Sequence, residues 1–240
     1  MTIIDSRTVL DQTASQYWLL EHPFYRAWLA GELTRSDLAD YAAQYRYVEQ
    51  ILPATLETIA AKLSAGPARR LVESNLADER FRPRPHLELL DDFAAAVGAD
   101  TSTGTSPTTA QLVATYQNAA EEGAVPGLAV IGAYEVQASD VAATKAASLR
   151  SDYHLDSVGT QFWDVHAGLE ESHANWTAEA IEKLCPAHED VKRYAAASAA
   201  AWWAFLDERE AARRADRLFA HSIASTYPLS TGSARPHTAA

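Results

Sequence analysis

Alanine-rich segments with helical periodicity dominate this chain and most restrict what it can fold into. Apolar residues recur every three or four positions through most of the 240 residues, whereas the alternation typical of β-strands is nearly absent. Apolar residues make up 48% of the chain and charged residues 22%, which is the balance of a globular protein with a substantial core. We therefore predict an all-α fold.

The periodic segments and their capping signals predict a single domain, a bundle of seven or eight helices. Gly98, directly after an apolar segment, is typical of a helix stop, and Pro107 is typical of a helix start. We expect residues 225–240 to form a flexible tail behind a helical domain of residues 1–224. The expected helical segments are 6–20, 23–30, 35–65, 68–78, 86–97, 108–122, 126–149, 157–174 and 188–219.

The charge balance and the cysteine content exclude several classes of protein. With 20 basic and 32 acidic side chains, the formal net charge is −12, which disfavours binding to nucleic acid or to anionic lipid. A single cysteine, Cys185, excludes an internal disulfide framework and any metal site that needs several thiolates. No apolar stretch approaches about 20 residues, and the N-terminal residues lack a basic segment followed by an apolar one. We therefore expect a cytoplasmic location without a membrane span.

Two histidines and a glutamate recur at helical spacing within the predicted helix 157–174. At about 100° per residue, Glu170 and His173 lie roughly 40° and −20° around the helix from His166, so all three share one face. Two imidazoles and one carboxylate placed in this way can bind a divalent metal ion. The spacing alone leaves a second interpretation open, in which the three side chains form a solvated helix face.

A glutamate in an apolar helix and a Glu–His pair add three further candidates. Glu135 lies in the apolar segment 127–136, where an ionised carboxylate needs a partner such as a metal ion. Glu79 and His86 are seven residues apart, which would place them on one face of a continuous helix. Two prolines between them interrupt the hydrogen bonds of that helix, so we do not expect the segment to stay helical.

Together these residues offer three imidazoles and three carboxylates, enough to bind two metal ions with coordination positions left for oxygen. Such nitrogen and oxygen ligands favour iron or manganese. Three carboxylates against two divalent ions leave one net positive charge, which favours an anion or reduced oxygen. The candidate metal ligands are Glu79, His86, Glu135, His166, Glu170 and His173.

In this order and spacing, the six residues resemble the heme-oxygenase-like dimetal oxidase family. Its pattern is Glu-x6-His, then a single Glu, then His-x3-Asp/Glu-x2-His, and the similarity extends over residues 18–205 of the chain. The resemblance implies a heme-oxygenase-like helical bundle without heme. It also implies a carboxylate-bridged Fe/Fe or Fe/Mn pair that activates O2 with electrons from an external reductant, and a homodimer.

Further motifs resemble one branch of that family, the CADD-type para-aminobenzoate synthases. In these proteins a tyrosine of the chain itself is cleaved to supply the aromatic ring, a lysine is implicated as the amine donor, and the product feeds folate synthesis. The resemblance gives these roles to Tyr25 and Lys145 and places Tyr134 close to the metal ions. The matching positions are 21–25, Trp28, 31–34, 41–42, Tyr45, Pro53, 78–79, 134–135 and Lys145.

The residues alone leave simpler roles open. Tyr25 can be a buried structural tyrosine. Lys145 follows Glu135 by ten residues, about 15 Å along the helix and roughly 80° around it, so it can equally be a surface lysine. Glu170 stands where CADD-type proteins have aspartate, which weakens the assignment to that branch but keeps a metal-binding carboxylate.

Three hypotheses about function follow. The first is a dimetal oxygenase that forms para-aminobenzoate from Tyr25 and needs O2 but no external organic substrate. The second keeps the metal centre but oxidises an external small molecule, by N-oxygenation of an amine or by oxidative cleavage of an amino or fatty acid. The third is a metal-free thiaminase-like or cofactor-binding bundle, similar to TenA, which lacks the six ligands.

Overall fold

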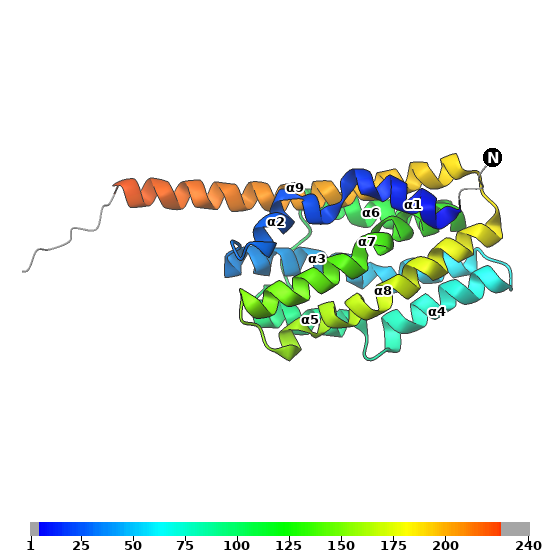
Figure 1. The fold of residues 1–240 in the computed structure, drawn as a ribbon, viewed down its shortest axis with the longest axis horizontal. Helices are drawn as coiled ribbons and strands as arrows, with labels where there is room; N and C mark the ends of the chain where they lie inside the picture. Colours follow the sequence, from blue (N-terminus) through cyan, green and yellow to red (C-terminus); the bar gives the residue numbers. More distant parts are fainter. Residues whose placement is uncertain (1–4, 227–240) are drawn as a thin grey trace, which may run out of the picture.

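The chain folds into an all-helical bundle, as the periodicity predicts (Figure 1). The computed structural model describes the backbone of residues 5–226 and the side chains of residues 5–219. Within this part of the chain there are nine α-helices and no strand, so the expected number of seven or eight helices is too low. The helices are α1 (Ser6–Ala14), α2 (Pro23–Leu29), α3 (Arg35–Ala61), α4 (Pro67–Phe81), α5 (His86–Val97), α6 (Pro107–Glu122), α7 (Ala124–Ser151), α8 (Ser157–Leu184) and α9 (His188–Thr226).

Tertiary contacts interrupt the helical pattern near the N-terminus. The sequence predicts one helix over residues 6–20, but α1 ends at Ala14 and two short 3₁₀ turns follow it. The amide of Leu19 donates to the buried side chain of Gln137 on α7 at 2.9 Å, instead of to a carbonyl of its own helix. Because this acceptor is distant in the chain, local periodicity cannot reveal the interruption.

Two prolines separate α4 from α5, as the sequence predicts. Helix α4 ends at Phe81 and α5 begins at His86, with Pro83 and Pro85 in the connection. Both helices pack against α8, with α5 near its N-terminal end and α4 further along it, so the chain continues in the same direction after the connection. The loop between the two helices, rather than one continuous helix, brings Glu79 and His86 together.

Helix α7 forms the centre of the bundle. It packs most extensively against α8 and α9, and also against α6 and α1. All of its residues from Gly127 to Ala133 are buried, which is typical of a helix enclosed by others on most sides. Although α7 is so apolar, neither it nor any other helix within residues 5–226 has the length and hydropathy to cross a bilayer.

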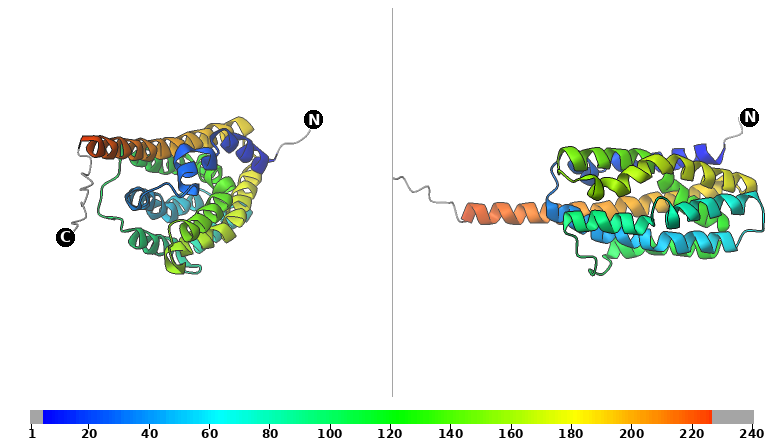
Figure 2. Two further views of the ribbon diagram at one scale, coloured as in Figure 1. Left: turned by 60° about the vertical axis from the view of Figure 1, so that its left-hand side comes forward. Right: turned by 90° about the horizontal axis from the view of Figure 1, so that it is seen from below.

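Helix α9 lies along one side of the bundle, and its C-terminal part projects beyond the other helices (Figure 1 and Figure 2). Leu218 and Phe219 on this projecting part are exposed. The sequence predicts that the helix ends at Phe219, but the backbone stays helical to Thr226. Residues 227–240 of the predicted tail 225–240 lie outside the described residues. The boundary between this tail and the domain of residues 1–224 therefore stays a prediction.

The same substitution, glycine to alanine, is expected to have opposite effects on stability at two positions of α8. A Cβ atom at Gly159 would lie 2.9 Å from the Cβ of Ala96 on α5, a contact that no side-chain rotation relieves, whereas at Gly168 it would meet nothing within 4 Å. We expect Gly159→Ala to lower the free energy of unfolding by about 1–3 kcal/mol and Gly168→Ala to raise it by about 0.5–1 kcal/mol. Urea unfolding of both variants checks this. Equal effects would contradict the close packing of α5 against α8.

Candidate metal centre

The six candidate ligands come from four helices and meet in the interior of the bundle. Glu79 lies in the last turn of α4, His86 begins α5, and Glu135 projects from the middle of α7. The other three candidates share one face of α8, as their spacing predicts. All six side chains are at most 6% exposed, so the alternative of a solvated helix face is wrong.

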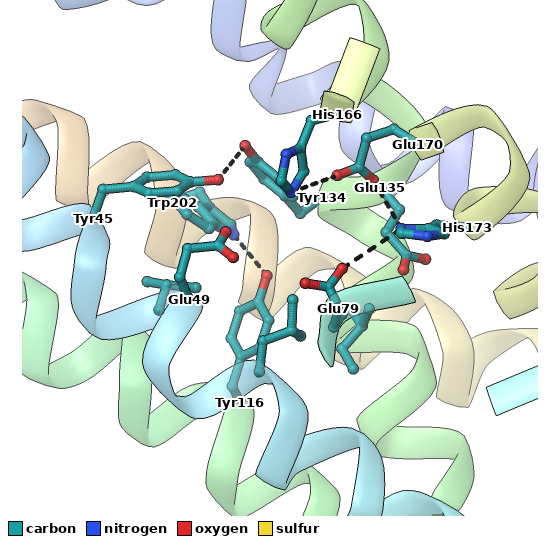
Figure 3. Close-up of a pocket in the computed structure, with 13 residues that line it drawn as sticks. Tyr45, Glu49, Glu79, Tyr116, Tyr134, Glu135, His166, Glu170, His173 and Trp202 are labelled. Carbon is teal, nitrogen blue, oxygen red and sulfur yellow. Dashed lines mark hydrogen bonds and ion pairs between the residues drawn. The ribbon is translucent and has the colours of Figure 1, made fainter. Parts of the chain in front are cut away.

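Ligand atoms of these side chains face one another across short distances, and Figure 3 shows all of them except His86. His86 Nδ1 lies 2.8 Å from Glu79 Oε2, and His173 Nδ1 lies 3.7 Å from Glu79 Oε1. Glu170 Oε1 lies 3.8 Å from His166 Nε2, and Glu170 Oε2 lies 3.9 Å from His173 Nδ1. One ligand atom each of Glu79, His86 and His166 falls within 4.8 Å of the other two. Most of these separations are too long for hydrogen bonds and suit donor atoms that bind a common ion at about 2 Å each.

Each histidine has one ring nitrogen engaged and the other directed at the centre. His166 Nδ1 donates to the backbone carbonyl of Phe162 at 2.8 Å, and His86 Nε2 donates to the carbonyl four residues before it at 3.1 Å. His173 Nε2 lies 3.4 Å from a carboxylate oxygen of Asp78. Because these acceptors take an N–H, they fix one proton of each ring on the nitrogen that faces away from the centre, so that the other nitrogen, when deprotonated, can bind a metal ion.

Two ligand atoms of the centre, Glu135 Oε2 and His86 Nδ1, have no hydrogen-bond partner among the described residues. Glu135 Oε1 accepts a bond from Asn75 at 2.7 Å, so its second oxygen alone is unpartnered. His86 Nδ1 contacts Glu79 without the alignment of a hydrogen bond. A bound cation would relieve both atoms, since a buried polar atom without a partner is unfavourable. The donor set of three imidazoles and three carboxylates therefore fits iron or manganese.

Burial disfavours charge in this centre. It raises the pKa of Glu135 and, with the neighbouring carboxylates, raises that of Glu170 well above its usual value. Burial and the nearby His86 lower the pKa of His166 to about 3. Burial also opposes the charged forms of Glu79 and His86, but their attraction outweighs it, which lowers the pKa of Glu79 and raises that of His86 to about 9. Divalent cations would supply the positive charge that these buried carboxylates otherwise lack.

An interior cavity of about 20 Å³ lies among the ligands (Figure 3). That volume holds about one molecule of the size of water. Five of the six candidate ligands line it, and His86 lies outside the lining. Tyr45, Glu49 and Tyr134 complete its polar wall. The cavity therefore has room for a small molecule such as O2.

Tyr25 and Lys145 form a buried pair in the core. Lys145 Nζ lies 2.7 Å from Tyr25 Oη and 2.6 Å from Tyr41 Oη. Both residues of the pair are 1% exposed, so the alternative of a surface lysine is wrong. The rings of Trp28 and Trp163 lie 5.1 Å and 4.1 Å from the amine. Burial lowers the pKa of Lys145 well below its usual value, which favours a neutral amine.

A chain of tyrosines connects this pair with the cavity. Tyr25 Oη contacts Tyr41 Oη at 2.8 Å, and the rings of Tyr41 and Tyr45 stack with their centroids 5.5 Å apart. Tyr45 Oη in turn contacts Tyr134 Oη at 2.9 Å, beside the cavity. Burial raises the pKa of all four phenols, so they stay protonated. The four rings form a continuous path between Tyr25 and the candidate metal ligands.

The structure adds functional candidates for which the sequence gives no role. Tyr41, Tyr45 and Glu49 are buried on α3. Their four-residue spacing on one helix face is the signal that could have found them. Burial and the adjacent Glu79 raise the pKa of Glu49 to about 8. Asn75, one turn before Glu79 on α4, is a further addition because it orients Glu135.

The buried position of Lys145 predicts a distinct pH dependence of stability. In the unfolded chain the Lys145 amine has a pKa of about 10.4, so it is protonated below that pH. In the folded chain the same amine stays neutral, because burial lowers its pKa. Because the unfolded state binds more protons, the free energy of unfolding of the wild type should rise with pH relative to that of Lys145→Met. The expected slope is about 1.4 kcal/mol per pH unit below about pH 9.5 and ends at the lowered pKa of the folded state, measured by denaturant unfolding. A difference that does not vary with pH would contradict a neutral Lys145.

A helical bundle with a buried cluster of histidines and carboxylates is typical of one class of protein. This class is the metal-binding redox enzymes. In agreement, the model of a family described as iron-containing redox enzymes matches residues 39–207, which include all six candidate ligands. The chain belongs to this family.

Individual relatives support the same assignment. A 4-aminobenzoate synthase of Nitrosomonas europaea is 34% identical over 218 residues, which cover 82% of this chain and 88% of that protein. A domain with a heme oxygenase-like fold from Shewanella denitrificans has a TM-score of 0.73 at 19% identity, covering 99% of this chain and 100% of that one. A CADD-like protein from Nostoc punctiforme has a TM-score of 0.69 at 18% identity, covering 87% and 96%. The two structures confirm the heme-oxygenase-like fold.

Proposed function

We propose that this enzyme is a dimetal oxygenase that uses O2 to form 4-aminobenzoate from its own Tyr25. The observation that carries the proposal is the 2.7 Å contact between Lys145 Nζ and Tyr25 Oη inside the core. This contact holds together an aromatic ring and an amine nitrogen, the sources of ring and nitrogen that the product needs, where both are shielded from solvent. The name of the Nitrosomonas europaea relative, 4-aminobenzoate synthase, supports the same product.

The six candidate ligands would hold two metal ions, as Fe/Fe or Fe/Mn. When bound, these ions would supply the oxidising power, from O2 and electrons of an external reductant. The residues of the chain fix the ligands in place. The carbonyl of Phe162 orients His166, Asp78 orients His173, and Asn75 orients Glu135.

The tyrosine path would link the metal centre to Tyr25, which does not line the cavity. Oxidation of a phenol removes an electron and a proton, and each phenol of the path has a neighbour at hydrogen-bonding or stacking distance. At the end of the path, the neutral amine of Lys145 can accept the proton of Tyr25 Oη. Tyr25, although it lies outside the cavity, can therefore be oxidised through the path and serve as the substrate.

The two other hypotheses find less support. The cavity of about 20 Å³ among the ligands offers an amino acid or a fatty acid little space, so an external organic substrate has less support than Tyr25. A metal-free TenA-like bundle is disfavoured because the chain belongs to a family of iron-containing enzymes and its six ligands converge. We further propose that the enzyme is a homodimer, as the family resemblance implies, and that its product feeds folate synthesis.

Isotopic labelling tests the source of the aromatic ring. The chain is produced in cells supplied with ring-labelled tyrosine, purified, loaded anaerobically with Fe(II) and Mn(II), and exposed to O2 and a reductant in the presence of unlabelled tyrosine. We expect the released 4-aminobenzoate to carry the label and the chain to lose the corresponding mass. Unlabelled product with an intact chain would instead favour an external substrate.

A further inference from the structure

Glu49 on α3 is a buried carboxylate that the six-ligand centre does not use. Its side chain is 4% exposed, and its Oε2 has no hydrogen-bond partner within the part of the chain that the structure describes. Arg80, the basic residue beside it, pairs with Glu57 at 2.6 Å instead. In its ionised form a buried carboxylate without a partner is strongly unfavourable, so a cation beside Glu49 would stabilise it.

The inner side of Glu49 faces the metal centre. Glu49 lines the same cavity as five of the six candidate ligands. Its carboxylate points into the space between Tyr45, Tyr116 and Glu79 (Figure 3). Glu79 and His86 are its charged neighbours. The unpartnered oxygen therefore belongs to the surroundings of the ion that Glu79 and His86 would bind.

The outer side of Glu49 borders a surface groove. Glu49 and Glu79 are the two residues that line both this groove and the interior cavity. They therefore stand between the centre and the surface, where an arriving ion would meet them first. The rest of the groove is formed by Gln50, Pro53, Arg80, Phe81, Pro85 and Leu87.

We propose that Glu49 is a seventh metal-binding residue, which receives a divalent ion from the groove and binds it beside Glu79 and His86. This inference rests on the dimetal centre proposed above. With Glu49, four carboxylates neutralise two divalent ions, whereas the three carboxylates of the motif leave a net positive charge in a buried site. Because Glu49 lies on α3, outside the spacing pattern of the other ligands, that pattern gives no indication of it.

Binding of Mn(II), followed by electron paramagnetic resonance of the free ion, tests the proposal without reference to activity. Glu49→Gln keeps the shape of the side chain and removes its charge. Glu57→Gln is the matched control, because it makes the same change two turns further along α3 at a partly exposed ion pair. We expect the wild type and E57Q to bind two ions with equal affinities, and E49Q to bind one of the two at least about tenfold more weakly.

The outcomes separate this inference from the proposed function. Two ions bound with wild-type affinity by E49Q would overturn the role of Glu49 and leave the six-ligand centre intact. Fewer than two ions bound by the wild type, also when Fe(II) is supplied together with Mn(II) and the total metal is measured by elemental analysis, would contradict the dimetal centre, and the role of Glu49 with it.

Unfolding measurements give a second readout. Without metal, E49Q should be at least as stable as the wild type, because an unpartnered buried carboxylate is removed. With excess Mn(II), the wild type should gain more stability than E49Q, since the gain follows the affinity. Glu49→Asp keeps the charge but shortens its reach, and it should also bind one ion more weakly. If E49Q does not fold, wild-type affinity in E49D would overturn the proposal.

Discussion

Replacing Tyr25 by phenylalanine is expected to reduce the release of 4-aminobenzoate to background while both metal ions stay bound. The substitution removes the Oη that contacts Lys145 Nζ at 2.7 Å and Tyr41 Oη at 2.8 Å, and with it the phenol that oxidation requires. Metal binding should not change, because Tyr25 does not line the cavity among the ligands. Mass spectrometry of the products measures the release after one exposure of the loaded protein to O2.

Tyr153→Phe provides the matched control. Tyr153 Oη donates to the carbonyl of Trp28 at 3.0 Å and accepts from the amide of Leu33 at 3.2 Å, so this variant also loses a hydroxyl with two partners. Each variant should lose about 1–3 kcal/mol of stability, which a domain stable by about 5–15 kcal/mol tolerates. We expect Y153F to release product in the wild-type amount. The same amount released by Y25F would contradict Tyr25 as the source of the ring.

Replacing Glu135 by glutamine is expected to remove at least one metal ion per chain and to reduce product release to background. The glutamine oxygen can still accept the bond from Asn75, which Glu135 Oε1 now accepts at 2.7 Å. The unpartnered Oε2, however, becomes an amide group that donates hydrogen bonds and does not bind a cation. Because burial already raises the pKa of Glu135, the metal-free variant should be no less stable than the wild type.

Elemental analysis by mass spectrometry after loading and desalting measures the metal content of E135Q. Asp140→Asn is the control, since it makes the equivalent change at an exposed position of the same helix. It should leave two ions per chain. Two ions retained by E135Q would show that Glu135 is a buried structural carboxylate and would remove it from the ligand set.

Ligands that lie close together in the sequence could be predicted, because helix geometry alone relates them. His166, Glu170 and His173 fall on one face of α8 at any orientation of that helix. Glu135 could be predicted from energetics, since a carboxylate within an apolar segment needs a partner. The spacing of Glu79 and His86 pairs them only on a continuous helix, and two prolines separate the helices that carry them, so the family resemblance is needed to place both in one centre.

The residues that could not be predicted depend on which helices pack together. The helical angle between Glu135 and Lys145 does not determine whether Lys145 reaches solvent, because α7 is enclosed on most of its sides. Its contact with Tyr25 requires α2 to lie against α7, which no local pattern indicates. Glu49 likewise acquires a role only once α3 lies beside α4 and the cavity forms between them.

X-ray diffraction from crystals of the metal-loaded protein, recorded at the iron and manganese absorption edges, tests most directly whether these side chains bind a pair of ions. We predict two anomalous peaks per chain, each about 2.0–2.3 Å from nitrogen and oxygen atoms of the ligand set. The set is Glu79, His86, Glu135, His166, Glu170 and His173, with Glu49 beside it. A single peak, or peaks bound by other residues, would contradict the dimetal centre on which the proposed chemistry depends.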